Sequence, residues 1–395
     1  MSLTISEPQS GFVVFWSKGF RPFFLAATAF AFVAMFVWSW ALFFGLTLHT
    51  GVLSYFQWHA HELLFGYGGA VLAGFLLTAA VNWTGHNTLS GPGLMLLVAV
   101  WLVARVGWLM GGPGLWYAGV ADGAFWLILM VAIARPIFIA KQWRQVGILA
   151  KLLLLFGAHL LFFLDALALL PGAAYGAIYA ALFTLVGLIL VMLRRIFPFF
   201  VKAASDGEVE LVNPSWIDRA SLILFVTLFL VVILRPDSPL APAVSAAAGL
   251  VLLVRLLNWY HPFIWQAPLL WSLYLGLGFV VIGCWMLAWS YWFVELRYLA
   301  VHAWAYGAFG LTSMGMVVRV AIGHSGNNVR AQRPWVFWVF VCLTVGAVLR
   351  VFMPLIWPQN PSVLLLSQVA WMLAYGICFY HLAVLFMQRQ TQGPR

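Results

Sequence analysis

The chain contains 395 residues, of which 65% are hydrophobic, 17% aromatic and only 8% charged. A soluble domain carries about 25% charged residues, so this composition excludes a conventional soluble enzyme and indicates a protein that crosses a membrane many times. The three cysteines lie inside apolar runs without Cys-x-x-Cys spacing, so neither a disulfide framework nor a thiolate zinc site is indicated. The chain also lacks the Cys-x-x-Cys-His motif of covalently attached haem.

The apolar residues fall into twelve stretches, each close to the ~20 residues that a membrane-spanning helix needs. They lie near residues 22–46, 57–82, 93–111, 114–134, 148–170, 173–193, 216–234, 240–258, 268–290, 298–322, 335–356 and 363–387. We therefore predict an all-α polytopic membrane protein with a cytoplasmic tail over 1–20, one twelve-helix transmembrane domain over 21–388 and a cytoplasmic tail over 389–395. Proline within Arg135-Pro136 and Phe197-Pro198 is interpreted as ending the helices there.

The basic residues alternate between the two sides of the predicted membrane. Sixteen of the 20 Lys and Arg residues fall at the N-terminal tail, the even-numbered connections and the C-terminal tail. Only Arg105, Arg235, Arg297 and Arg350 fall on the opposite side. Because cytoplasmic loops carry the excess of Lys and Arg, this asymmetry predicts that both termini are cytoplasmic. The net charge of +10 is thereby explained without nucleic acid as a partner.

The segment Gln57-Trp58-His59-Ala60-His61-Glu62 opens the second predicted span at its outer end. Ionisable groups inside a span are costly and mark functional sites. Residues two apart on a helix point about 200° away from each other, so His59 and His61 would serve two centres rather than one. His302 lies in the same outer layer, at the start of the tenth predicted span. His159 lies in the middle or outer half of the fifth span, and His49 lies in the outer loop before the second. Imidazole suits iron and copper, so His59, His61, His159 and His302 are the predicted metal ligands.

Two carboxylates accompany this layer. Glu62 and Asp165 are predicted to orient imidazole N–H groups, and Glu62 is alternatively a residue for proton delivery. The alternative to metal binding for each histidine is a structural role, in which it forms a hydrogen bond to a neighbouring helix. That alternative best explains the histidines near the inner face and in the outer loop, namely His49, His86, His261, His324 and His381.

A weak internal repeat links the second and tenth predicted spans. Gly69 and Gly310 each follow the outer histidine by eight residues, and Gly74 and Gly315 follow it by thirteen. If these spans face one another, His302 with His59 or His61 would form an axial pair for haem. Small residues would let the spans approach closely or admit a flat cofactor, although glycine is common throughout this chain.

Two outer arginines are candidates for binding the propionates of such a haem. Arg105 and Arg297 lie at the predicted outer side, where basic residues are scarce. The alternative for each is a side chain that extends to the membrane interface.

The motifs together resemble the NnrS family over most of the chain. They are Arg21-Pro22-Phe23-Phe24, Trp58-His59-Ala60-His61-Glu62, Gly74-Phe75-Leu76-Leu77-Thr78, Asn82-Trp83-Thr84-Gly85, and Arg319 followed by Gly323-His324-Ser325-Gly326. This resemblance implies a bacterial inner-membrane protein that contains haem, expected to be b-type, and copper. It implies a role in the nitric oxide response and denitrification.

Three kinds of activity remain open from the sequence. The first is a redox protein that binds or reduces nitric oxide, with electrons from quinol or a partner protein. The second is a transporter or a metal- or haem-delivery protein, since twelve spans with repeats fit many carriers. The third is a haem-based sensor without turnover. The span number also predicts, by analogy, the helix arrangement of haem-copper oxidases.

Overall fold

A computed structural model describes residues 11–48, 50–235, 237–358 and 360–387. Every regular element within these ranges is a helix, and no strand occurs in them. Twelve helical units in this part of the chain are long and apolar enough to cross a membrane. The all-α fold and the twelve spans predicted from the sequence are therefore confirmed.

The spans have the following bounds in chain order. They are α2 (Phe20–Phe43), α3 to α4 (Tyr55–Thr84), α5 (Gly91–Met110), α6 (Gly114–Ile139), η2 with α7 (Trp143–Ala166), α8 (Ala173–Ala204), α9 (Ser215–Leu234), α10 (Leu240–Asn258), α11 (Pro268–Trp289), α12 to α13 (Glu295–His324), α14 with α15 (Pro334–Ile356) and α16 (Pro361–Met387). Two short helices, α1 (Gly11–Phe15) and η3 (Pro262–Gln266), lie outside the spans.

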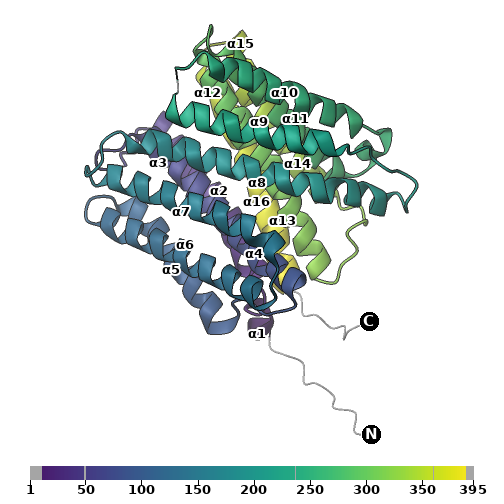
Figure 1. The fold of residues 1–395 in the computed structure, drawn as a ribbon. Coiled ribbons are helices and arrows are strands. Elements are labelled where there is room, and N and C mark those ends of the chain that lie inside the picture. The colour runs from purple at the N-terminus through teal and green to yellow at the C-terminus, as the bar shows by residue number, and fades with distance from the viewer. Residues whose placement is uncertain (1–10, 49, 236, 359, 388–395) are drawn as a thin grey trace.

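The spans form one bundle in which neighbours in the chain pack side by side (Figure 1). Pairs α5–α6, α7–α8, α10–α11 and α14–α16 are in extensive contact, and α16 packs back against α2. The units Tyr55–Thr84 and Glu295–His324 are the most buried, since 83% and 78% of their most apolar windows are covered by other helices. These two spans, which carry His59, His61 and His302, therefore lie at the centre of the bundle, where a polar group must find its partners in the protein.

Both central spans contain a π-helical segment directly after the outer histidine. η1 (Glu62–Tyr67) follows His61, and η4 (Ala303–Gly310) follows His302. In η1 the N–H of Gly68 donates to the carbonyl of Leu63, five residues earlier. Such segments are rare and occur frequently at functional sites, because the wider turn re-aims the side chains beside it. The internal repeat thus extends from residue spacing to backbone geometry.

The repeated glycines lie against side chains of neighbouring helices. A Cβ at Gly69 would come within 3.2 Å of Phe125, and one at Gly310 within 3.1 Å of Trp371. A Cβ at Gly74 would approach Phe24 to 2.7 Å. Side chains of neighbouring helices lie directly beside these glycines, so the small residues serve close helix packing.

The structure corrects the interpretation of two prolines. Pro136 lies inside α6 and Pro198 inside α8, and both helices continue past them to Ile139 and Ala204. A proline removes one backbone hydrogen bond. Ending the helix within the apolar layer would leave more backbone groups without partners, so continuing it is less costly.

Candidate metal centre

The helix that carries the paired histidines begins at a capping box. The Ser54 hydroxyl accepts a hydrogen bond from the Gln57 N–H, and the Gln57 side chain accepts one from the Ser54 N–H at 2.7 Å. This reciprocal cap defines the start of α3 (Tyr55–His61) and with it the direction in which His59 and His61 project. The two imidazoles then have separate neighbours.

His61 is completely buried and contacts the carboxylate next to it. Its Nδ1 lies 2.8 Å from Oε1 of Glu62, while its Nε2 lies 3.5 Å from Nδ1 of His159 and 3.9 Å from Oδ2 of Asp122. Oε1 of Glu62 also accepts a hydrogen bond from Arg105, so this oxygen carries no proton. Nδ1 of His61 therefore donates to it, and Nε2 presents a lone pair. That lone pair faces His159 and Asp122.

His159, on α7 (Val146–Ala166), is held by a backbone carbonyl. Its Nε2 lies 3.1 Å from the carbonyl oxygen of Gly119, which also only accepts. Nε2 of His159 is therefore the protonated nitrogen, and Nδ1 presents its lone pair to His61. Two imidazole lone pairs thus face each other at 3.5 Å with a carboxylate oxygen beside them. Without a cation between them this contact has no hydrogen to share.

The ligand atoms of these residues have spacings that suit a metal ion. The group His61, Asp122 and His159 offers three ligand atoms that all lie within 4.8 Å of one another, and each residue is buried. Ligands at ~2.0–2.1 Å from a tetrahedral ion lie ~3.3 Å apart, close to the 3.5 Å separation of the two nitrogens. Each imidazole also donates its other N–H to a carboxylate or a carbonyl, the usual arrangement around metal-bound histidine.

Arg105 joins the two carboxylates of the centre. It lies on α5, is only 3% exposed, donates to Glu62 Oε1 at 2.5 Å and is hydrogen-bonded to Asp122 Oδ1. Trp108 donates to the other Asp122 oxygen at 2.8 Å. With both carboxyl groups ionised, one guanidinium leaves one formal negative charge in this buried cluster. A bound metal cation would offset that charge, whose burial alone is costly.

Aromatic side chains separate the centre from water. The His61 ring lies 4.5 Å from the rings of Trp108 and Phe162 and 4.9 Å from that of Phe65, measured between centroids. Water-poor surroundings of this kind strengthen every electrostatic interaction within the cluster.

His59 has a different environment on the other side of the same helix. Its ring stacks on Trp38 with centroids 4.4 Å apart and planes at 22°. Its Nδ1 is buried and has no hydrogen-bond partner among the described residues. A buried nitrogen without a partner costs free energy, so this position is suited to a ligand that the protein itself does not supply.

His302 contacts an arginine. Its Nδ1 lies 2.9 Å from the carbonyl oxygen of Tyr298 and its Nε2 lies 3.1 Å from Nη2 of Arg350. Both ring nitrogens are thus engaged. Among the described residues His302 forms no hydrogen bond or ring contact with His59 or His61, but it interacts electrostatically with His59, and Arg350 acts on both imidazoles. Arg297 lies half-buried in the first turn of α12 (Glu295–His302), five residues before His302.

The remaining predicted residues lie apart from the centre. Asp165 accepts a hydrogen bond at 2.7 Å from the N–H of Ala174 at the start of α8, and so connects two helices. His381 stacks on Trp335, His261 accepts from its own loop, and His86 is exposed. His49 lies outside the described residues.

Sequence reasoning missed Asp122, the carboxylate that completes the group. The available signal was an acidic residue in the apolar stretch 114–134, which by the rule used for the histidines marks a functional position. Arg105 was expected at haem propionates or the membrane interface, whereas its terminal nitrogens bind Glu62 and Asp122.

A haem between the central spans does not match the cavities described. Cavities of about 840 Å³ and 650 Å³ lie at the other end of the spans, and neither is lined by His59, His61 or His302. An apolar cleft between α4, α8 and α13 measures about 70 Å³, below the ~300 Å³ at which cofactor pockets begin. No chemical step is therefore assigned to haem.

Comparison with known proteins agrees with the resemblance seen in the sequence motifs. None of the curated proteins compared with the chain matches it. The family model described as NnrS protein matches residues 14–390, nearly the whole chain. The chain therefore belongs to the NnrS family of membrane proteins.

Proposed function

We propose that this protein binds nitric oxide, or a related small oxide of nitrogen, at a metal ion held by His61, Asp122 and His159. The observation that carries the proposal is the pair of buried imidazole nitrogens, Nε2 of His61 and Nδ1 of His159, 3.5 Å apart beside the Asp122 carboxylate. Family membership is consistent with a role in the nitric oxide response. The proposed setting is the inner membrane of a bacterium, with the centre near the periplasmic face.

Copper is the metal that we propose for this centre. Imidazole nitrogen is a good donor for copper, and the family resemblance implies copper as well. When bound, the ion would supply a redox-active Lewis acid for a small diatomic ligand. Two histidines and one carboxylate are also the donor set of many non-haem iron(II) sites, so iron is the alternative that metal analysis must separate.

The protein residues around the ion would hold its ligands and supply protons. Glu62 fixes the protonation of His61, and Arg105 holds Glu62 and Asp122 in place. The second carboxylate oxygen of Glu62, Oε2, is buried and has no partner among the described residues. Reduction of two nitric oxide molecules to nitrous oxide and water consumes two electrons and two protons. Glu62 is placed to pass on protons in that reaction.

Metal analysis with electron paramagnetic resonance tests the centre directly. The purified protein is expected to contain copper whose spectrum shows coupling to imidazole nitrogen. His61→Ala and His159→Ala should both lose that copper. His381→Ala is the matched control, because this half-buried histidine stacks on Trp335 away from the centre and should leave the copper content unchanged. Copper that survives both variants would overturn the assignment.

Consumption of nitric oxide separates an enzyme from a sensor. We propose that reduced quinol, or a redox partner protein, supplies the electrons. Nitric oxide should then disappear from a sealed electrode chamber with formation of nitrous oxide. Binding of nitric oxide without turnover would indicate a sensor. Export of copper or haem from vesicles, with neither binding nor turnover of nitric oxide, would favour the transporter or delivery alternative. Optical spectra of the same preparation measure whether haem, implied by the resemblance, is present.

A further inference from the structure

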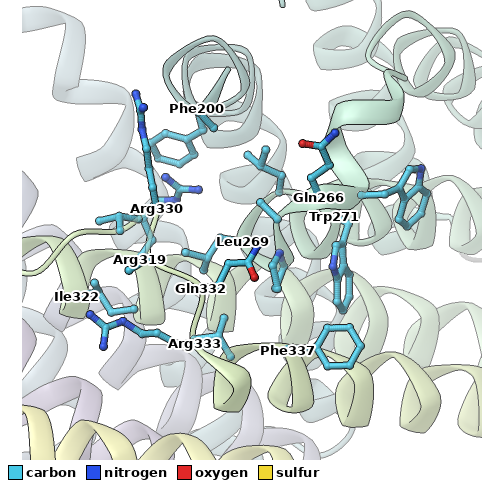
Figure 2. Close-up of a pocket in the computed structure, with 18 of the residues that line it drawn as sticks. Phe200, Gln266, Leu269, Trp271, Arg319, Ile322, Arg330, Gln332, Arg333 and Phe337 are labelled. Carbon is cyan, nitrogen blue, oxygen red and sulfur yellow. The ribbon is translucent and has the colours of Figure 1, made fainter. Parts of the chain in front are cut away.

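A large basic cavity lies at the end of the spans opposite the histidines. It measures about 840 Å³ and is formed by the end of α8, η3, the start of α11, the end of α13 and the start of α14. Figure 2 shows Arg319, Arg330 and Arg333 along one side, and Gln266, Trp271 and Phe337 along the other. Arg319 follows His302 by 17 residues in one helical unit, which places the cavity ~25 Å from the histidine layer.

Two of these arginines lack an anionic partner within the protein. Neither Arg319 nor Arg333 forms an ion pair with a carboxylate of the residues that the structure describes, and the Nε of each is buried without an acceptor. The Arg319 guanidinium lies 3.9 Å from the centroid of the Phe200 ring, and Nη2 of Arg333 lies 3.5 Å from the Asn327 side chain. These groups are held in position while much of their hydrogen-bonding capacity is unused.

The third arginine is already neutralised. Arg330 pairs with Asp206 at 2.6 Å and contacts the carbonyl oxygen of Ala203. It therefore closes the rim of the cavity between two loops. The unpaired positive charge that a ligand would meet comes from Arg319 and Arg333.

The wall chemistry indicates an amphipathic ligand. Aromatic and aliphatic side chains, including Phe200, Trp271 and Phe337, alternate with the amides of Gln266 and Gln332. The cavity lies among span ends, where headgroups and acyl chains meet. Arginine forms bidentate hydrogen bonds with phosphate, and basic pockets between membrane helices bind anionic lipid headgroups.

We propose that this cavity binds the phosphodiester headgroup of an anionic phospholipid. Arg319 and Arg333 contact the phosphate, the amides contact the polar part of the headgroup, and the aromatic wall packs against the start of the acyl chains. The shared phosphate chemistry would also fit a soluble phosphate compound, and the apolar wall is what favours the lipid. This inference does not depend on the metal centre.

Native mass spectrometry of the detergent-purified protein measures the binding. Phosphatidylglycerol is expected to bind more tightly than zwitterionic phosphatidylcholine. Arg319→Gln combined with Arg333→Gln should weaken phosphatidylglycerol binding about 25-fold, about fivefold for each arginine, from the ~1 kcal/mol that one arginine contributes near an anionic headgroup. Arg219→Gln is the matched control, since this exposed arginine of α9 does not line the cavity and should leave the affinity unchanged.

A second variant keeps the test valid if the double variant folds poorly. Gln332→Glu changes no shape but places a negative charge in the cavity while both arginines remain, and it should also weaken phosphatidylglycerol. Equal affinity of phosphatidylglycerol for the wild type and Gln332→Glu would overturn the site. Displacement of the lipid by millimolar inorganic phosphate would overturn the lipid assignment in favour of a soluble ligand.

Discussion

Among single residues, Arg105 has the most demanding position. It is only 3% exposed although its helix α5 lies at the edge of the bundle, and its charge is balanced by Glu62 and Asp122. A Cβ at Gly66 would come within 2.6 Å of its Nη1, so the glycine of the π segment is what makes room for the guanidinium. Charge, hydrogen bonding and backbone geometry therefore depend on one another here.

Arg105→Gln is expected to lower the free energy of unfolding by about 3–5 kcal/mol, because two buried carboxylates lose their shared cation. The measurement is denaturant- or heat-induced unfolding of the purified protein. The exposed pair of Lys202 with Glu210 provides the control, since exposed pairs contribute little and Lys202→Gln should change stability hardly at all. Arg105→Gln that is as stable as the control would contradict this account of the cluster.

His59→Phe separates the roles of the two paired histidines. Phenylalanine keeps the stacking on Trp38 and removes the buried nitrogen that has no partner, so stability should be retained. Because His59 projects away from His61, the copper-to-protein ratio should also stay at the wild-type value. Loss of copper in this variant, measured by elemental analysis, would show that both histidines serve one ion.

At the scale of elements, the two π segments connect the histidines to the rest of their spans. Each begins directly after the outer histidine of a central span, and both carry a glycine packed on a neighbouring helix, Gly66 in η1 and Gly307 in η4. The wider turn of a π segment rotates the helix after it relative to the helix before it. Side chains on the two sides of the segment therefore face the neighbouring span differently than in a continuous α-helix. The direction of His61 therefore depends on η1 as well as on its own rotamer.

Deletion of Leu63 is expected to convert η1 to regular α-helix and rotate His61 by about 100° relative to α4 (Gly68–Thr84). His61 would then leave His159, and the metal should be lost. Circular dichroism should show unchanged helix content, and metal analysis should show the loss. Leu63→Ala is the control, since it keeps the length of the segment; full metal content in the deletion variant would show that η1 does not orient the ligand.

For the whole molecule, the structure shows that some of the basic residues on the predicted outer side bind groups inside the protein. Of the four Lys or Arg residues on the predicted outer side, Arg105 binds the carboxylates of the metal centre and Arg350 binds His302. Two of the four outer basic residues therefore have partners inside the protein, so the count of basic residues on that side is not a count of surface charges. Cytoplasmic termini remain a prediction from the asymmetry of the basic residues.

Reporter fusions test the orientation. Green fluorescent protein fused to the C-terminus should fluoresce, because it folds in the cytoplasm, and alkaline phosphatase inserted after Pro113 should be active, because it needs the periplasm. The opposite pattern would invert the topology and move the metal centre to the cytoplasmic side. The fold itself would be unaffected by that result.

Much of the fold follows from the sequence alone. Each span satisfies its own backbone hydrogen bonds, so length and hydropathy suffice to locate all twelve, with ends within a few residues in most cases. The spacing of His59 and His61 likewise implied two different surroundings, because it depends only on helix geometry. The contacts between spans could not be predicted from the sequence. The rotation of each helix about its own axis depends on side-chain packing and on π segments, which local sequence patterns do not reveal. Tertiary structure alone therefore decided that His61 meets His159 and Asp122, and that Arg105 binds their carboxylates.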